Sequence, residues 1–382
     1  MDRIKIITIF GTRPEAIKMA PLVKKMRKKP CIESKICVTA QHRQMLDQVL
    51  NLFDIEPDFD LNVMKDKQSL TGITSRVLIG LEEIFKSEKP DLVLVHGDTT
   101  TTFAGALAAF YQKIRVGHVE AGLRTYDKYF PFPEEMNRKL TGAIADMHFA
   151  PTLGSKQNLL REGVNENNIY ITGNTVIDAM EFTVDNNYTF NNKELNNIKF
   201  DRRKVIMVTA HRRENWGDGI KNICKALKSI IEENKDTELV YLVHLNPVVR
   251  DTVYSILGNV DRVHLLEPLD TKETHNLMNK CYMIMTDSGG LQEEAPHLGK
   301  PVLVLRNVTE RPEAVKAGTV KLVGTDFNKI VECANELIRD KDEYQKMSRA
   351  INPYGDGKAS SRIVKAILQY FNIEHGEFKE FN

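Results

Sequence analysis

Cysteine is scarce in this chain of 382 residues and follows no pattern that binds metal or builds a disulfide framework. The five cysteines include no Cys-x-x-Cys pair, and their number is odd. Structural zinc sites need clustered cysteines and disulfide frameworks need paired ones, so we expect neither. Scattered, reduced thiols are typical of a cytoplasmic protein, and this is the location that we predict.

The chain also lacks long apolar runs and an excess of charge of either sign. The first apolar run, Ile4–Phe10, is too short for the core of a signal peptide. No run reaches the roughly 18 apolar residues that a membrane span needs. With 53 Lys and Arg against 52 Asp and Glu, no global field attracts nucleic acid or an anionic membrane, so neither is an expected partner.

Several motifs of well-known enzyme classes are missing as well. The chain has no Gly-x-Gly-x-x-Gly after its first apolar run and no Walker A motif, which disfavours a dinucleotide oxidoreductase and a P-loop NTPase. It has no Gly-x-Ser-x-Gly elbow of a hydrolase. The histidines are not at metal-ligand spacing, and no Asp-x-Asp clamp is present. The remaining chemistry is acid/base catalysis without a cofactor or metal.

Short runs rich in Ile and Val alternate with helix-like stretches. The runs are continuously apolar, which is typical of parallel strands buried on both faces. A chain of this length favours two domains, so we predict two doubly wound α/β domains, 1–175 and 200–359. A linker at 176–199 would join them, and the C-terminal helix 360–382 would return to the first domain. No regular element is expected between Asp185 and Arg203. The runs are Ile4–Phe10, Lys35–Thr39, Asp91–His96, Val116–Val119, Val205–Thr209, Leu239–His244, Val263–Leu266, Met283–Thr286 and Val302–Leu305.

Polar residues follow the first run directly. Ligands of parallel α/β sheets bind beyond the carboxyl ends of the strands, so these residues are candidates for a site. Thr12 is placed to cap a helix, and Pro14 suits its first turn. Arg13 and Lys18 would then contact phosphate, or else be solvated cations on a capped helix.

Three carboxylates in the first half form a second candidate cluster. Asp98 and Glu120 each follow an apolar run, and Glu134 lies in a loop stiffened by two prolines. Carboxylates in a partly dry cleft can have perturbed pKa values and act as acid and base. Each one alone could equally be a cap or an ion-pair partner, but together they favour a shared site.

The second half offers a histidine and a glycine turn. His211 follows an apolar run and could donate to a phosphate, transfer a proton or cap a turn, and the residues alone do not choose between these roles. Ser288-Gly289-Gly290 precedes a helix expected at Leu291–His297. Unhindered amides at such a position bind diphosphate, and Glu294 lies within reach of a ribose hydroxyl.

Five ordered motifs resemble those of one family. From about Ile4 to Ile367 the chain resembles the non-hydrolysing UDP-N-acetylglucosamine 2-epimerases. The motifs are Phe10-Gly11-Thr12-Arg13-Pro14-Glu15-Ala16, His96-Gly97-Asp98-Thr99-Thr100, Val119-Glu120-Ala121-Gly122-Leu123-Arg124, Thr209-Ala210-His211-Arg212-Arg213-Glu214-Asn215 and Asp287-Ser288-Gly289-Gly290-Leu291-Gln292-Glu293-Glu294.

The resemblance implies a fold, a reaction and partners. The fold is the glycosyltransferase-B architecture, two Rossmann-like domains with the nucleotide sugar between them, usually in a homodimer. The reaction interconverts UDP-N-acetylglucosamine and UDP-N-acetylmannosamine by elimination of UDP to a 2-acetamidoglucal and re-addition. No redox cofactor or metal is implied. Three alternatives stay open: a hydrolysing relative that releases N-acetylmannosamine and UDP, an acceptor-dependent glycosyltransferase, and a nucleotide-sugar sensor without turnover.

The same resemblance implies roles for individual residues. Asp98, Glu120 and Glu134 would manage the C2 proton, with base and acid not assigned among them. Ser288, Gly289 and Gly290 would form an amide cradle for the diphosphate, and Glu294 would contact ribose. The remaining residues expected around the substrate and its departing UDP are Arg13, Lys18, Arg138, His211, His244 and Arg311.

Two departures from the family pattern affect binding. Thr274 stands where members commonly carry Phe, which weakens uracil stacking by roughly 1 kcal/mol unless the backbone at Leu269 holds the base. A regulatory second substrate site would include Gln41, Gln44 and Lys67. A family Arg is Lys at position 67, which keeps the charge but loses the planar fork of donors. Allosteric activation by substrate is expected, with a weaker contact there.

Overall fold

Two compact α/β units make up the computed structural model, which describes residues 3–40, 43–64 and 68–381, without the side chains of residues 43–45. Unit 1 comprises Met1–Phe182 and Tyr354–Asn382, and unit 2 comprises Thr183–Pro353. Each unit is a doubly wound parallel sheet, which confirms the predicted fold class. Among the described residues, no helix is long and apolar enough to span a bilayer.

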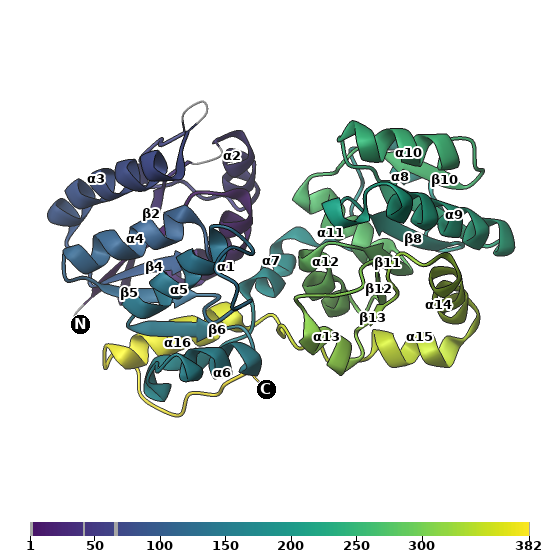
Figure 1. Cartoon of the computed structure of the whole chain (residues 1–382). Coiled ribbons are helices and arrows are strands. Elements are labelled where there is room, and N and C mark those ends of the chain that lie inside the picture. The colour runs from purple at the N-terminus through teal and green to yellow at the C-terminus, as the bar shows by residue number, and fades with distance from the viewer. Residues whose placement is uncertain (1–2, 41–42, 65–67, 382) are drawn as a thin grey trace. The chain divides into compact units, whose positions relative to one another are not determined.

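The sheet of unit 1 has seven parallel strands in the order β3-β2-β1-β4-β5-β6-β7 (Figure 1). The strands are β1 (Ile4–Phe10), β2 (Ile32–Val38), β3 (Phe59–Asp60), β4 (Leu92–His96), β5 (Arg115–Val119), β6 (Met147–Ala150) and β7 (Ile169–Ile171). The helices are α1 (Arg13–Arg27), α2 (Arg43–Leu52), α3 (Leu70–Glu88), α4 (Thr100–Tyr111), α5 (Glu134–Ile144), α6 (Leu153–Arg161), α7 (Thr175–Thr183) and α16 (Ala359–Tyr370), with a 3-10 turn at Glu166–Asn168.

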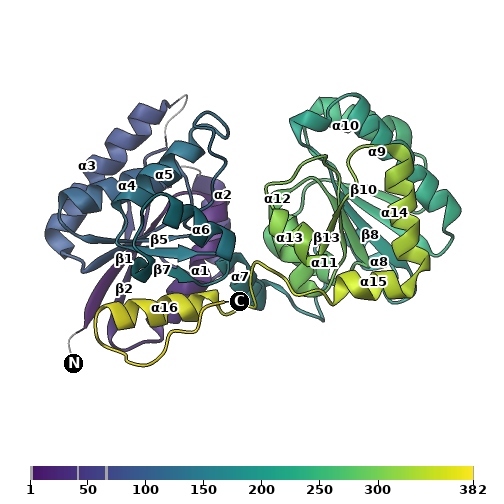
Figure 2. The ribbon, with the colours of Figure 1, turned by 60° about the horizontal axis from the view of Figure 1, so that its bottom comes forward.

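The apolar residues of β1 belong to two cores, one on each face of its sheet. Ile6 and Phe10 pack into the cluster that α1, α2 and α16 cover, whereas Ile7 and Ile9 pack into the cluster under α3 and α4. All four side chains are 0% exposed. Figures 1 and 2 show the two helical layers on opposite sides of the sheet, with α16 beside α1. A strand buried on both faces needs apolar residues on both, and β1 has them at five of its seven positions, with Lys5 and Thr8 as the exceptions.

Unit 2 repeats this plan with six parallel strands in the order β10-β9-β8-β11-β12-β13. The strands are β8 (Lys204–Thr209), β9 (Thr237–Leu242), β10 (Val263–Leu266), β11 (Met283–Thr286), β12 (Val302–Val304) and β13 (Val320–Leu322). The helices are α8 (Lys193–Asn197), α9 (Asp218–Glu233), α10 (Pro247–Leu257), α11 (Thr271–Lys280), α12 (Gly289–Glu294), α13 (Pro312–Ala317), α14 (Phe327–Arg339) and α15 (Lys341–Ser348), with 3-10 turns at Arg213–Asn215 and Ala295–Leu298. Helices α9, α10 and α14 enclose the main core of this unit.

The limits of the units follow from local contacts at the connections. Asp178 of α7 accepts hydrogen bonds from the backbone N–H of Ala359 at 3.1 Å and of Ser360 at 2.7 Å, so α7 and the start of α16 are tied within unit 1. After α7, the N–H of Asp185 donates to Asn276 at 2.7 Å and that of Asn191 to Glu273 at 2.7 Å. Residues beyond α7 therefore pack on α11 of unit 2, in the region that the sequence suggests as a linker.

Some predicted elements need correction. The stretch between Asp185 and Arg203 contains the short helix α8, although no element is expected there. The helix predicted at Leu291–His297 begins at Gly289 and changes to a 3-10 turn at Ala295. Strands β3, β6, β7 and β13, which are two to four residues long, were not predicted.

Each sheet reverses its strand order at one point. In unit 1 the order turns between β1 and β4, and in unit 2 between β8 and β11. Open parallel sheets bind ligands outside the carboxyl ends of the strands at this switch point, because the following loops diverge to opposite faces. The polar motifs of the sequence follow these same strands, so the topology places them where a ligand site is expected.

Candidate active site

The loop between β1 and α1 is held by a glutamate that serves structure. Glu15 is 3% exposed, and its carboxylate accepts hydrogen bonds from the N–H of Gly11 at 3.1 Å and of Thr12 at 2.8 Å. It also accepts from the hydroxyl of Thr99 at 2.7 Å in the loop after β4. Burial raises the pKa of Glu15, and these hydrogen bonds oppose the rise. The two loops at the switch point are thus fixed to each other, with Thr12 at the N-cap as predicted.

The carboxylate of Glu120, directly after β5, is surrounded by polar side chains. Its Oε1 atom is ion-paired with Lys18 of α1 and accepts a hydrogen bond from the Asn174 side chain at 2.9 Å. Its Oε2 atom lies 3.7 Å from Nε2 of His96. The backbone φ of Glu120 is +62°, a left-handed conformation that costs a non-glycine residue about 1–2 kcal/mol. The contacts therefore hold this carboxylate in one orientation despite a strained backbone.

Asp98, the second residue after β4, has a partly exposed carboxylate that binds its proton more tightly than a free aspartate does. Its side chain is 32% exposed, and Arg138 of α5 lies 3.6 Å from its Oδ2 atom. Loss of solvent around the carboxylate raises the pKa of Asp98 to about 6, although Arg138 opposes the shift and the charges of Glu120 and Glu134 add to it. Asp98 thus titrates close to neutral pH, as an acid/base group should.

Two predicted residues of α5, Glu134 and Arg138, act on Asp98, and the unpredicted Glu135 holds Arg138. Glu134 is the first residue of α5, where its charge acts on Asp98. Arg138 is ion-paired at 3.0 Å with buried Glu135. Glu135 also accepts hydrogen bonds from the N–H of Thr125 at 3.0 Å and of Tyr126 at 2.9 Å. Glu135 therefore holds the guanidinium of Arg138 in place, and a terminal nitrogen of that guanidinium faces Asp98.

The predicted phosphate-binding residue Arg13 is the first residue of α1 and is half-buried.

Behind the carboxylates lie two buried, neutral histidines that the sequence did not single out. Burial lowers the pKa of His96 to about 4, against the attraction of Glu120. Burial lowers the pKa of His118 to about 3, and its Nε2 atom donates to the carbonyl of Gly97 at 2.7 Å. His96 is the last residue of β4 and His118 the last but one of β5, so both buried rings lie next to the loops that carry Asp98 and Glu120.

In unit 2 a buried aspartate organises the loop after β8. Asp287 is 0% exposed, and its Oδ2 atom accepts from the N–H groups of His211 and Arg212, both at 2.8 Å, and from the Asn215 side chain at 3.0 Å. Its Oδ1 atom lies 3.6 Å from Nδ1 of His211. The Asp-Ser-Gly-Gly motif after β11 therefore fixes the His-Arg-Arg-Glu-Asn motif after β8 across the switch point.

His211 and His244 lie with their rings stacked, 5.3 Å between centroids at an interplanar angle of 12°. Burial lowers the pKa of His211, with Asp287 opposing the shift and His244 adding to it. His211 is hence neutral at pH 7. With the Asp287 carboxylate beside Nδ1, that nitrogen carries the hydrogen of the neutral ring, and Nε2 is an acceptor that donates only when the ring is protonated.

The glycine turn of unit 2 has a guanidinium beside it. Gly289 is buried at the first position of α12. A Cβ atom there would lie 3.8 Å from a terminal nitrogen of Arg311, and Arg311 is ion-paired with Glu293. The amides of Ser288-Gly289-Gly290 and the charge of Arg311 therefore lie together, as an anion site requires.

The residues predicted to contact the ribose and the base are Glu294 at the end of α12, Leu269 before α11 and Thr274 within α11. Glu294 places its Oε2 atom 3.4 Å from Nε2 of His275. Leu269 is half-buried in the loop before α11. Thr274 donates its hydroxyl to the carbonyl of Asp270 at 2.7 Å, which stabilises the first turn of the helix.

Sequence reasoning missed Asn174 and His275. Asn174 is a polar residue after an apolar run, but that run is the three-residue strand β7. His275 lies inside a helix and carries no local signal. Of the regulatory candidates, Gln41 and Lys67 lie outside the described residues, as does the side chain of Gln44 in α2.

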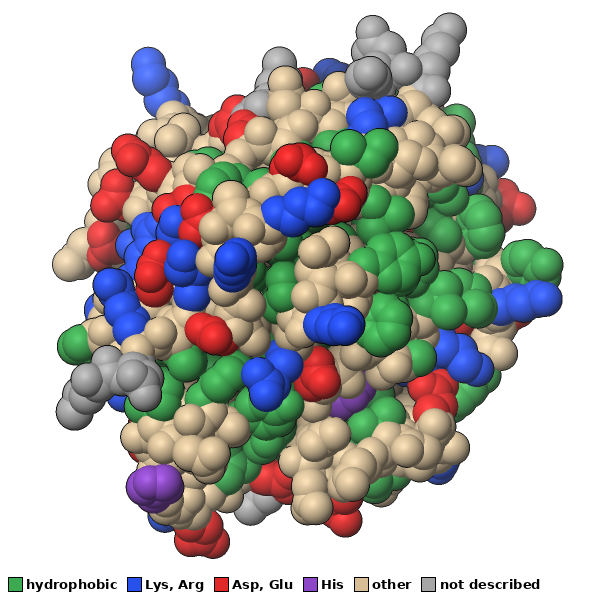
Figure 3. All heavy atoms as spheres, turned by 90° about the vertical axis from the view of Figure 1, so that its left-hand side faces the viewer, with side chains coloured by type: hydrophobic (Ala, Val, Ile, Leu, Met, Phe, Trp, Pro, Cys, Tyr) green, Lys and Arg blue, Asp and Glu red, His purple; other side chains and the backbone are tan. Residues whose placement is uncertain are grey.

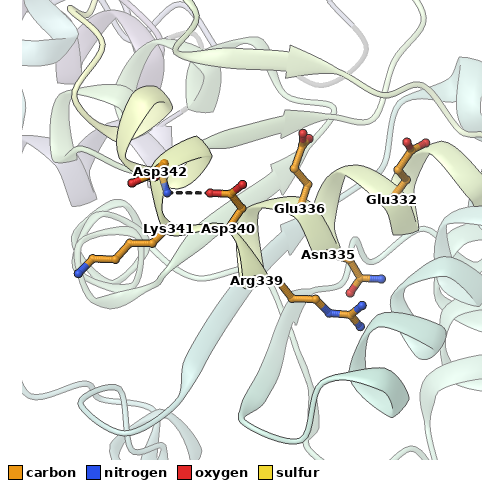
Figure 4. A pocket seen from close by; sticks show the side chains of 7 residues that line it. All are labelled: Glu332, Asn335, Glu336, Arg339, Asp340, Lys341 and Asp342. Carbon is orange, nitrogen blue, oxygen red and sulfur yellow. Dashed lines mark hydrogen bonds between the residues drawn. The ribbon is translucent and has the colours of Figure 1, made fainter.

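A hollow of about 590 Å³ lies elsewhere, on α14 and α15 of unit 2. It contains none of the predicted site residues. Figure 4 shows that its side chains point in different directions rather than toward one centre. The residues that line it are Glu332, Asn335, Glu336, Arg339, Asp340, Lys341 and Asp342.

Unit 1 thus offers carboxylates for proton transfer, and unit 2 offers an anion site beside a carboxylate. The family model described as UDP-N-acetylglucosamine 2-epimerase matches residues 24–368. The chain is 59% identical to the UDP-N-acetylglucosamine 2-epimerase of Bacillus subtilis over 371 residues, 97% of each protein. It is 57% identical to that of Escherichia coli K12 over 377 residues, 95% of this chain and 98% of the other.

Solved structures agree with the sequence comparisons. The UDP-N-acetylglucosamine 2-epimerase of Neisseria meningitidis bound to UDP-N-acetylglucosamine matches with a TM-score of 0.83 at 51% identity, over 96% of this chain and 100% of the other. A crystal structure of another UDP-N-acetylglucosamine 2-epimerase matches with a TM-score of 0.93 at 56% identity over the full length of both chains. This likeness and the two parallel sheets confirm the two-domain glycosyltransferase-B type of fold. The chain belongs to the UDP-N-acetylglucosamine 2-epimerase family.

Proposed function

We propose that this protein epimerises UDP-N-acetylglucosamine at C2 reversibly and without hydrolysis, by way of a 2-acetamidoglucal intermediate. The single observation that carries the proposal is Asp98, a carboxylate with a pKa of about 6 at the switch point of unit 1. A group that titrates near neutral pH can both take and return a proton within one catalytic cycle.

The reaction needs a balanced pair of steps. In the first, a carboxylate removes the C2 proton, the C1–O bond to UDP breaks, and a C1–C2 double bond forms. In the second, UDP adds back to C1 and C2 receives a proton on the opposite face. Asp98, Glu120 and Glu134 supply the carboxylates for this exchange. Lys18 and Asn174 hold Glu120 in place.

Unit 2 supports the leaving group. We assign the diphosphate to the amides of Ser288-Gly289-Gly290, with Arg311 beside them, because fixed donors and cations stabilise charge that grows on departing UDP. His211 would donate a hydrogen bond from Nε2 to the same phosphates in its protonated form, which the charge of Asp287 beside Nδ1 favours. Arg13, Arg138 and His244 remain assigned to the substrate from the resemblance.

Proton NMR in deuterated water tests the reaction with UDP-N-acetylglucosamine as the substrate. We expect deuterium at C2 and a mixture of the two UDP-sugars, without free sugar. Stoichiometric UDP and free N-acetylmannosamine would show a hydrolysing enzyme, and turnover that requires an added acceptor would show a transferase. Binding without C2 exchange would show a sensor.

A sigmoidal dependence of rate on substrate would support the regulatory site predicted at Gln41, Gln44 and Lys67. The protein would act in the cytoplasm, and its product would supply surface-polysaccharide or wall-polymer synthesis.

We also propose that the protein is a homodimer that associates through unit 1. Figure 3 shows hydrophobic side chains gathered on the face of unit 1 where α3 and α4 lie. Exposed apolar residues there include Ile79, 67% exposed, Phe110, 58%, and Tyr111, 64%. Such patches mark association surfaces. Light scattering should give about twice 43.5 kDa, and Tyr111→Glu should give the monomer. Ile351→Glu, at an exposed residue of unit 2, should leave the mass unchanged.

A further inference from the structure

A buried histidine in unit 2 links the end of α7 to the glutamate assigned to ribose. His275 of α11 is 3% exposed. Its Nδ1 atom lies 2.6 Å from the hydroxyl of Thr183, and its Nε2 atom lies 3.4 Å from Oε2 of Glu294. Thr183 is 1% exposed. Three side chains from α7, α11 and α12 therefore form one continuous polar row.

The chemistry of the row assigns its hydrogens. An ionised carboxylate only accepts hydrogen bonds, so Nε2 of His275 must carry the hydrogen that faces Glu294. In a neutral imidazole Nδ1 is then an acceptor, and the Thr183 hydroxyl donates to it. Glu294 thus selects the ring tautomer, and the Thr183 hydroxyl satisfies Nδ1 of that tautomer and holds the ring in place. A side chain of the same shape without a hydroxyl would leave Nδ1 without this donor.

The place of Glu294 explains what such a row controls. A Cβ atom at Gly290 would lie 3.5 Å from Oε1 of Glu294. One carboxylate oxygen therefore lies against the glycine turn assigned to the diphosphate, and the other faces His275. His275 follows Thr274, on the helix assigned to the base. The row thereby joins the base side of the nucleotide site to the phosphate side through the carboxylate between them.

We propose that Thr183 and His275 are positioning residues that orient Glu294 toward the ribose hydroxyls and so determine the selectivity for UDP over deoxy-UDP. The inference rests on the proposed assignment of Glu294 to ribose. A carboxylate that accepts from a ribose hydroxyl loses its partner when the ligand lacks that hydroxyl, and an oriented acceptor discriminates more strongly than a mobile one. Selectivity should therefore depend on residues that never touch the nucleotide.

Isothermal titration calorimetry of the full-length protein with UDP, 2′-deoxy-UDP and 3′-deoxy-UDP tests the proposal. The wild type should bind UDP at least tenfold more tightly than one of the two deoxy ligands. His275→Asn keeps an amide near Nδ1 but cannot reach Glu294, so it should weaken UDP binding about tenfold and leave the affinity for that deoxy ligand unchanged. His275→Gln places an amide near Nε2 and should retain most of the selectivity.

Thr183 provides an independent pair of variants. Thr183→Val removes the hydroxyl at constant shape and should lower the selectivity, whereas Thr183→Ser retains the hydroxyl and should keep it. These variants also serve if His275→Asn fails to fold. Glu294→Ala gives the reference for complete loss of the ribose contact.

The outcomes distinguish the assignment of Glu294 to ribose from the positioning role of Thr183 and His275. A wild type that binds all three ligands equally would refute the assignment of Glu294 to ribose. A selective wild type with equally selective His275→Asn and Thr183→Val variants would refute only the positioning role. Equal weakening of all ligands in these variants would indicate a structural role of the row and would also overturn the proposal.

Discussion

A methyl group added at Gly97 tests whether the position of the Glu120 carboxylate matters for turnover, and the same change at Gly163 controls for backbone strain. Its φ is +66°, and a Cβ atom built there would lie 3.3 Å from Oε2 of Glu120. Gly163 has a φ of +85° and no atom within 4 Å of such a Cβ. Alanine at either glycine meets the same left-handed penalty of about 1–2 kcal/mol. Only at Gly97 does the methyl group press on a carboxylate of the proposed active site.

The expected size of the effect follows from that distance. Ordinary contacts begin at 3.4 Å, so the Glu120 carboxylate must move by a few tenths of an ångström. Lys18 and Asn174 hold the other oxygen, which limits the ways in which it can move. A displacement of about 1 Å at a reacting group costs roughly 10² in rate, so Gly97→Ala should lower turnover roughly tenfold.

Urea unfolding and initial rates of epimerisation, measured on both variants, check this reasoning. Gly97→Ala and Gly163→Ala should lose similar stability, whereas Gly163→Ala should retain nearly wild-type turnover. Equal turnover in the two variants would refute the view that the fixed position of Glu120 matters for the reaction. A much larger loss of stability in Gly97→Ala would show that the buried loop cannot accommodate the methyl group at all.

Three further changes test other parts of the molecule. Asp98→Asn should lower turnover about 10² or more and abolish the limb of the pH–rate profile near pH 6, while calorimetric UDP binding and the melting temperature stay unchanged. His118 has a pKa of about 3 in the fold against 6.5 unperturbed, so the stability that it contributes when neutral is lost as the pH falls below 6.5. His118→Gln should consequently reduce the loss of unfolding free energy between pH 6.5 and 4.5 by about 2–3 kcal/mol, measured by urea titrations at both pH values. Asp287→Ala removes the acceptor of three hydrogen bonds that hold the loop after β8 and should cost about 3 kcal/mol in the same assay, whereas Asp287→Asn retains an acceptor and should cost far less.

The sheets were predictable because their pattern is local and repeated. A strand such as β1, buried on both faces, is apolar at most of its positions, and its bounds Ile4–Phe10 are those that the sequence predicts. Strand β7 is only three residues long, so its partner in hydrogen bonding rather than its composition makes it a strand. Asn174, which follows β7, was missed for that reason. His275 was missed because its meaning depends on Thr183 and Glu294, which are distant from it in the sequence.

Spacing also cannot separate a carboxylate that serves structure from one that serves chemistry, whereas the number of donors around it can. Glu15 and Asp98 both follow strands of one sheet, and their spacing from those strands does not separate their roles. In the fold Glu15 accepts from backbone N–H groups and from hydroxyls of Thr12 and Thr99, so its oxygens are used in joining two loops. Asp98 instead faces Arg138 at 3.6 Å and keeps a third of its side-chain surface exposed. A carboxylate that lacks tight donors and retains access to ligand, yet has a raised pKa, can exchange a proton during turnover. This difference, which arises from packing between distant loops, is what supports Asp98 as an acid/base group in the proposed reaction.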